Sequence, residues 1–162
     1  MSREFKKGKI HDVKATPLRK FVDDRGWLAE LWRTDNVEEQ YRPVMTYISQ
    51  TEPHVTRGPH EHVEQTDIFA FLGPGNFMLR VWDNRPSSPT YNVMETMFVG
   101  ADNPMSVLIP PGVAHAYKNV SHTVGIVINS PNQLYRGKNY AEPIDEIRHE
   151  DDPDSPFKMN TH

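Results

Sequence analysis

Two short histidine motifs carry the chemistry that this sequence offers. In the stretch RGPHEH, His60 and His62 stand two residues apart, and the carboxylate of Asp67 follows five residues later. The later stretch PPGVAHAYKN carries His115. Side chains two apart on a strand point to the same face of a sheet, so His60 and His62 are expected to share a face. Imidazoles and carboxylates can bind a transition metal, and an imidazole can also transfer a proton near neutral pH.

Composition indicates one small domain. The 162 residues include no cysteine and carry a net charge of −4. Disulfides and thiol nucleophiles are therefore excluded, and the interspersed charges show no nucleic-acid footprint. No apolar run approaches the roughly 18 residues that a membrane span needs, and the polar N-terminus has no signal-like apolar stretch. We expect one domain over residues 1–162, located in the cytoplasm, with neither nucleic acid nor membrane as a partner.

Short segments rich in β-branched and aromatic residues indicate strands. Fourteen prolines and nine glycines separate these segments, which is typical of a sandwich or barrel. The turn sequence GPGN predicts that residues 68–83 form a hairpin. One helical turn is predicted at residues 37–42, and the polar residues 141–162 are expected to form a surface tail. The predicted strands are residues 45–51, 68–72, 76–83, 105–110, 115–120 and 123–129, in a core spanning about 43–130.

The two histidine stretches resemble the signature motifs of the cupin superfamily. HEHVEQTDIFAFLG is similar to the first motif, H-x-H followed by Glu and then Gly, with Asp67 in place of the usual Glu. PPGVAHAYKN is similar to the second motif, P-x-G-x-x-H-x-x-x-N. This resemblance implies an all-β fold, the cupin double-stranded β-helix or jelly-roll barrel, with short helical turns at its periphery and the site inside.

A narrower resemblance covers most of the chain. Four stretches are similar, in order, to motifs of the dTDP-4-dehydrorhamnose 3,5-epimerase family: DDRGWLAELWR, RGPHEH, VWDNRPSSPTY and IPPGVAHAY. The resemblance implies an isomerase that acts on a nucleotide-linked 4-keto-6-deoxyhexose and requires no cofactor. It also implies a homodimer that exchanges N-terminal strands, here residues 10–34.

The resemblance implies a role for each matching residue. His60 matches the general base, which removes the proton α to the 4-keto group. Arg25, Glu30 and Arg57 match positions that line the substrate site, and His115 matches a second pocket histidine. The proposed chemistry is coherent, because a ketone acidifies the neighbouring C–H and a neutral imidazole can accept that proton.

Three departures from the family alter the expected machinery. Asp67 stands where the family has a lysine that stabilises the enolate, and residues 125–129 lack the family's tyrosine acid. We also expect the chain to lack the C-terminal aspartate that pairs with the base. Tyr117 is then the leading proton donor, with Tyr47 as a weaker candidate, although Tyr117 could equally be core packing. Epimerisation at one carbon, or ketone isomerisation, is expected rather than a double epimerisation.

Asp67, together with His62 in place of the glutamine of the family motif, creates a candidate metal site. His60, His62, Asp67 and His115 offer three imidazoles and a carboxylate, a ligand set that suits Zn, Fe, Ni or Mn. Such a metal could stabilise an enolate as a Lewis acid. A metal-bound His60 cannot act as the base, so the two mechanisms compete. The alternative functions are a metal-dependent cupin enzyme, such as a dioxygenase or small-sugar isomerase, and a non-catalytic sugar-binding cupin.

Other polar segments are expected to have no role in chemistry. SSPTY, within VWDNRPSSPTY, is expected to shape a turn and a strand. The acidic run formed by Glu150, Asp151, Asp152 and Asp154 is expected to be solvated. Solvent-facing positions are predicted for His11, His54, His122, His149 and His162.

Overall fold

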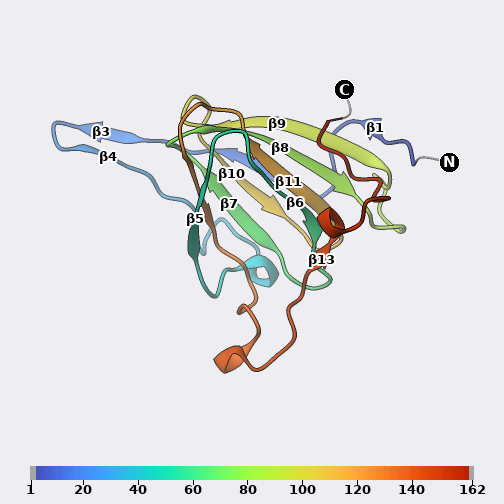
Figure 1. Cartoon of the computed structure of the whole chain (residues 1–162). Helices are drawn as coiled ribbons and strands as arrows, with labels where there is room; N and C mark the ends of the chain where they lie inside the picture. Colours follow the sequence, from blue (N-terminus) through green and yellow to red (C-terminus); the bar gives the residue numbers. More distant parts are fainter. Residues whose placement is uncertain (1–2, 161–162) are drawn as a thin grey trace.

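The computed structural model describes residues 3–160, which fold almost entirely into short strands. The six-stranded sheet has the order β1-β9-β8-β11-β6-β13, and the five-stranded sheet has the order β2-β10-β7-β12-β5 (Figure 1). The first contains β1 Lys6–Lys7, β6 Thr56–Glu61, β8 Asn76–Asp83, β9 Val93–Gly100, β11 Val113–Asn119 and β13 Ile147–Arg148. The second contains β2 Lys14–Pro17, β5 Tyr47–Thr51, β7 Asp67–Phe71, β10 Met105–Ile109 and β12 Gly125–Asn129. This architecture confirms the predicted jelly-roll fold.

The main core lies between the two sheets. Phe69 and Val107 from the five-stranded sheet pack with Phe77, Leu79 and Val113 from the six-stranded sheet, and all five side chains are buried. Burial of apolar surface stabilises the folded state by roughly 25 cal/mol per Å². The candidate site residues lie at one end of this packed core.

The predicted hairpin over residues 68–83 is wrong. β7 pairs with β10 and β12 in one sheet, whereas β8 pairs with β9 and β11 in the other. Both edges of each strand are therefore already occupied. A Cβ added to Gly75 would stand 2.7 Å from the Cα of Gly125, so the two backbones lie in close contact. The GPGN turn thus carries the chain from one sheet to the other.

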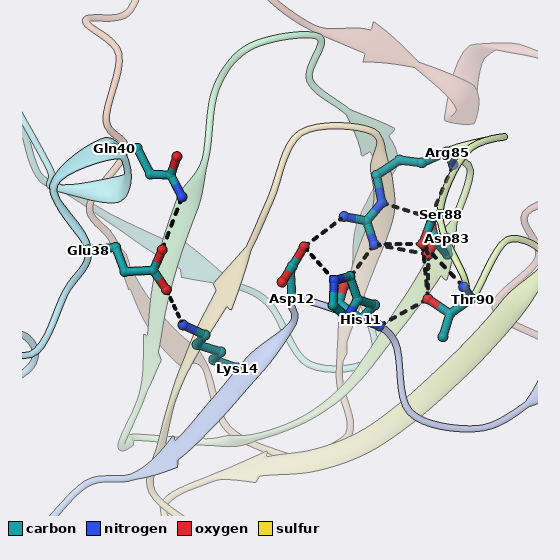
Figure 2. A network of polar contacts seen from close by, with 9 residues as sticks. All are labelled: His11, Asp12, Lys14, Glu38, Gln40, Asp83, Arg85, Ser88 and Thr90. Atoms are coloured by element: carbon teal, nitrogen blue, oxygen red, sulfur yellow. Dashed lines mark hydrogen bonds and ion pairs between the residues drawn. The ribbon is translucent and has the colours of Figure 1, made fainter.

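A network of polar contacts begins where β8 ends (Figure 2). The buried carboxylate of Asp83 accepts hydrogen bonds from Arg85 Nε at 2.8 Å and from the hydroxyls of Ser88 and Thr90, both at 2.6 Å. The backbone N–H of His11 donates to Thr90 Oγ1 at 3.0 Å. The SSPTY segment therefore shapes the β8–β9 connection, as its sequence predicts, and also holds the N-terminal segment.

Two segments extend the barrel. β3 Phe21–Asp23 and β4 Gly26–Leu28 form a hairpin that projects away from the sheets (Figure 1). The C-terminal segment returns to the barrel, where β13 pairs with β6 and Phe157 is buried against Trp82. The short 3₁₀ helices are η1 Glu39–Tyr41, η2 Lys138–Tyr140 and η3 His149–Asp151.

Within residues 3–160, no helix has the length and apolar character that crossing a membrane requires.

Candidate active site

The structure brings three predicted imidazoles together. β6 and β11 are antiparallel neighbours, and their register places His115 directly opposite His60. The centroids of these two rings lie 4.5 Å apart, and the ring of His62, just beyond β6, lies 5.7 Å from His60 and 5.8 Å from His115. One nitrogen from each ring lies within 4.8 Å of the other two. The three rings thus form a single cluster, here called the histidine cluster.

Asp67 reaches this cluster from the opposite sheet, at the start of β7. Its Oδ2 lies 3.0 Å from Nε2 of His62 and 3.4 Å from Nε2 of His115. Its Oδ1 accepts hydrogen bonds from the side-chain amides of Gln65 at 2.9 Å and Asn129 at 2.8 Å. The carboxylate is only 1% exposed, so protein groups replace its hydration.

Two buried atoms at the contact between Asp67 and His115 lack a hydrogen bond. Among the residues described, Oδ2 of Asp67 and Nε2 of His115 have no aligned partner. Nδ1 of His115 lies 3.1 Å from the carbonyl of Val113, which can only accept, so Nδ1 carries a proton. A buried polar atom without a partner costs about 1–3 kcal/mol. A proton or a cation between Nε2 and the carboxylate would satisfy both atoms.

The pKa values of two histidines in the cluster are shifted in opposite directions. Burial, together with the neighbouring His115 and His62, lowers the pKa of His60 to about 2, so this ring is neutral at pH 7. Burial also acts to lower the pKa of His62, but the carboxylate of Asp67 and the backbone of Asp145 outweigh it and raise that pKa to about 9. Burial opposes ionisation of Asp67, yet His115 and His62 hold its pKa far below the usual range.

A cavity of about 1050 Å³ opens onto the cluster. Its lining includes His60, His62 and Tyr117 from the barrel and many of the residues between 133 and 150. His115 and Asp67 lie behind this lining. A sugar nucleotide needs a cavity of this order, since ligand pockets measure roughly 300–1,000 Å³.

Two tyrosines and one arginine predicted from the sequence also line this cavity. The Tyr117 hydroxyl lies 3.4 Å from Ser49 Oγ, and burial raises its pKa, so the phenol stays protonated. Burial raises the pKa of Tyr47 to about 12. The guanidinium of Arg57 donates to Thr51 Oγ1 at 3.0 Å and to a backbone carbonyl at 2.7 Å, which orients it at the cavity edge.

Arg25 and Glu30 lie elsewhere. Arg25 sits at the tip of the β3–β4 hairpin, where it pairs with Asp23, and Glu30 lies 3.5 Å from Arg33. Neither Arg25 nor Glu30 is among the described residues that line the cavity. A single chain therefore does not place these two side chains beside His60.

The C-terminal segment supplies carboxylates that motif reasoning missed. Glu146 Oε1 and Glu150 Oε1 lie 3.8 and 3.9 Å from His60 Nδ1, and Arg148 contacts both acids. Both acids line the cavity, so Glu150 differs from the expectation that its charge run is only solvated. Pairing of β13 with β6 brings them there, and no local motif announces that pairing.

The remaining histidines follow the prediction only in part. His11, His54 and His122 are exposed, as expected. The prediction for His149 is wrong: its side chain is 16% exposed, lies 3.2 Å from Glu61 Oε1 and packs on Phe157. His162 lies outside the described residues.

Comparisons with known proteins agree on one family. The profile of the dTDP-4-dehydrorhamnose 3,5-epimerase family matches residues 7–153. The probable low-salt glycan biosynthesis epimerase Agl13 of Haloferax volcanii is 35% identical over 85% of this chain and 86% of its own. The spore coat polysaccharide biosynthesis protein SpsL of Bacillus subtilis is 34% identical over 94% and 97%. The crystal structure of a dTDP sugar isomerase from Desulfovibrio desulfuricans superposes with a TM-score of 0.80, at 22% identity over 94% of each chain.

Proposed function

Since the chain belongs to the dTDP-4-dehydrorhamnose 3,5-epimerase family, we propose that it is an isomerase of nucleotide-linked 4-keto-6-deoxyhexoses. It removes a proton α to the ketone and returns a proton to the same carbon. Epimerisation at one carbon is favoured over epimerisation at two. The observation that carries the proposal is the convergence of His60, His62, His115 and Asp67 at one end of a sugar-sized cavity.

His60 is the proposed base. Its neutral ring has the protonation state that proton abstraction requires, although its lowered pKa makes it a weak proton acceptor. The carboxylates of Glu146 and Glu150, near its Nδ1, would stabilise the imidazolium that forms. His62, whose raised pKa keeps it protonated at pH 7, supplies positive charge for the enolate and so takes over the role of the family's lysine, whose own position Asp67 occupies.

The test is exchange of substrate hydrogen with solvent. Wild-type protein is incubated with dTDP-4-keto-6-deoxyglucose in D₂O, and proton NMR follows deuterium incorporation at C3 and C5. We expect incorporation at one carbon, with formation of the corresponding epimer. Binding without exchange on this and related keto sugars would instead favour the non-catalytic sugar-binding cupin.

A metal-dependent enzyme is the second candidate, favoured by the unsatisfied Oδ2 of Asp67 and Nε2 of His115. Epimerases of this family need no cofactor, but these donor types fit a divalent transition metal. His60, His62, Asp67 and His115 would hold the ion, and a bound ion would supply Lewis-acid stabilisation of an enolate.

Metal analysis separates the two candidates. Protein purified without chelator is assayed for Zn, Fe, Ni and Mn, and then for exchange activity after treatment with EDTA. A stoichiometric metal whose removal abolishes exchange would favour the metal enzyme. Undiminished exchange after EDTA treatment would exclude it and leave His60 free to act as the base.

We further propose a homodimer. The projecting β3–β4 hairpin exposes apolar side chains, among them Val22 at 74% and Trp27 at 51%, and exposed apolar surface of this kind marks an interface. The same hairpin carries Arg25 away from the cavity of its own chain. Exchange of this hairpin between subunits would bring Arg25 to the partner's site. The cytoplasmic location stays a prediction.

A further inference from the structure

Asp145 connects the C-terminal segment to the turn that separates His62 from Asp67. Its carboxylate accepts three backbone hydrogen bonds, from Val63 at 2.8 Å and from Glu64 and Gln65 at 2.9 Å each. Its own backbone carbonyl contacts Nδ1 of His62. One residue thus holds both the turn and a ring of the histidine cluster.

The strand register explains this placement. β13 pairs antiparallel with β6, with Ile147 opposite Glu61 and Arg148 opposite His60. Continuing that register by two residues brings Asp145 opposite Val63, just past the end of the ladder. A carboxylate there faces the successive N–H groups of the turn, and such charge-assisted hydrogen bonds are among the strong ones.

The carbonyl of Asp145 selects the orientation of the His62 ring. A backbone carbonyl only accepts hydrogen bonds, so Nδ1 of His62 must carry a proton. Nε2 is then directed toward Asp67 Oδ2, at 3.0 Å, and toward the side-chain nitrogen of Gln65, at 3.3 Å. Gln65, whose backbone N–H binds Asp145, also donates to Asp67 Oδ1. Asp145 therefore contacts His62 and Gln65 directly, and it reaches Asp67 through the side chain of Gln65.

We propose that Asp145 is a positioning residue, which acts on the reaction through His62 by fixing that ring and the 63–65 turn at the cavity wall. The inference rests on the proposed function. It holds whether a proton or a metal ion lies between His62 and Asp67, since both need Nε2 directed inward. Loss of the outer partner of a metal-ligating histidine typically costs roughly 10–100-fold in metal affinity or activity, and we expect a loss of similar size here.

The first arm of the test measures deuterium exchange into dTDP-4-keto-6-deoxyglucose. Asp145→Ala is expected to lower the exchange rate roughly 10–100-fold, mainly in kcat. Asp145→Asn keeps one acceptor oxygen and is expected to lose less. Asp154→Ala is the matched control, because Asp154 is an exposed acid of the same segment. Thermal unfolding of each variant verifies that it is folded at the assay temperature.

The second arm asks whether Asp145 acts through His62. In a His62→Gln background, Asp145→Ala is expected to cost less than about threefold, because the ring it positions is gone. A purely structural role would give the same loss in both backgrounds. An equal loss, or an Asp145→Ala rate within twofold of wild type, would overturn the inference.

The third arm does not depend on activity. Nitrogen-15 NMR of the imidazoles is expected to show His62 Nδ1 protonated in wild type. Asp145→Ala keeps the backbone carbonyl but loses the carboxylate that anchors it to the 63–65 turn, so a mixture of ring states is expected in the variant. An unchanged His62 spectrum in the variant would overturn the inference. If wild-type protein exchanges no keto sugar at all, the proposed function fails, and this spectrum still decides the role of Asp145.

Discussion

At the scale of single residues, the proposed chemistry requires different charge states of side chains that are buried next to one another. As the proposed base, His60 must be neutral to accept a proton, and burial beside two other imidazoles keeps it so. Asp67 must be charged although it is buried, and His62 and His115 make that possible. The raised pKa of Tyr117 keeps its phenol protonated, as a proton donor requires. The environment of His60 therefore suits the proposed base, and that of Tyr117 suits the proposed proton donor.

Tyr117→Phe separates proton donation from core packing. We expect epimer formation to fall about 100-fold, because the variant cannot return a proton, while α-hydrogen exchange at His60 continues. Proton NMR of substrate and product in D₂O measures both rates. Tyr47→Phe is the comparison variant and is expected to have the smaller effect. If Tyr117→Phe leaves both rates unchanged, Tyr117 only packs against its aromatic neighbours.

At the scale of elements, strand pairing supplies what the motifs alone do not. β6 and β11 place His60 opposite His115, and β7 adds Asp67 from the other sheet. The polar network at the end of β8 joins the N-terminal segment to the barrel (Figure 2). Stability of this connection therefore depends on one buried carboxylate, that of Asp83.

Asp83→Asn is expected to destabilise the fold and to change its acid sensitivity. Burial alone would raise the pKa of Asp83, but Arg85, Ser88 and Thr90 lower it to about 2, from an ordinary value of 3.8. Because the folded-state pKa is the lower one, the stability that it contributes is present above pH 4 and is lost between about pH 4 and 2. Loss of the ion pair with Arg85 should cost about 2–4 kcal/mol at pH 7.

Denaturant unfolding at several pH values measures this effect. The wild-type free energy of unfolding should fall more steeply below pH 4 than that of Asp83→Asn. Asp24→Asn, on the exposed hairpin, is the control. Parallel curves of unfolding free energy against pH for wild type and Asp83→Asn would show that the network does not cause the loss of stability below pH 4.

The sequence could predict the elements whose positions local motifs encode. The two cupin-like motifs predicted the jelly roll, and four ordered motifs predicted the family. HEHVEQTD and PPGVAHAYKN together supplied the three imidazoles that now form the histidine cluster. The hairpin over 68–83 failed because a turn motif does not say which strands already pair with its flanking segments. Asp145, Glu146 and Glu150 were missed because the pairing of β13 with β6 joins residues more than eighty positions apart.

At the scale of the whole molecule, the described chain places one group of predicted site residues at the cavity and another group away from it. The barrel and the C-terminal segment enclose the histidine cluster. The β3–β4 hairpin, by contrast, carries its apolar side chains and Arg25 into solvent. A twofold dimer would bury these side chains and give each site a contribution from both subunits.

Subunit complementation tests this arrangement. His60→Ala and Arg25→Ala proteins are each expected to be impaired, and mixing them after unfolding and refolding together should restore up to roughly a quarter of wild-type exchange. Heterodimers then hold one site with both wild-type residues. Light scattering verifies the dimer. A monomer in solution, or a mixture no more active than its components, would rule out a shared site.

The most direct test of the central claim is the effect of His60→Ala on α-hydrogen exchange. Wild type and variant are compared in D₂O with dTDP-4-keto-6-deoxyglucose, after calorimetry confirms that both are folded and bind the sugar nucleotide. The account predicts exchange by wild type and a loss of at least about 100-fold in the variant. Equal exchange by the two proteins would contradict it, because the reaction would then proceed without the histidine around which the site is built.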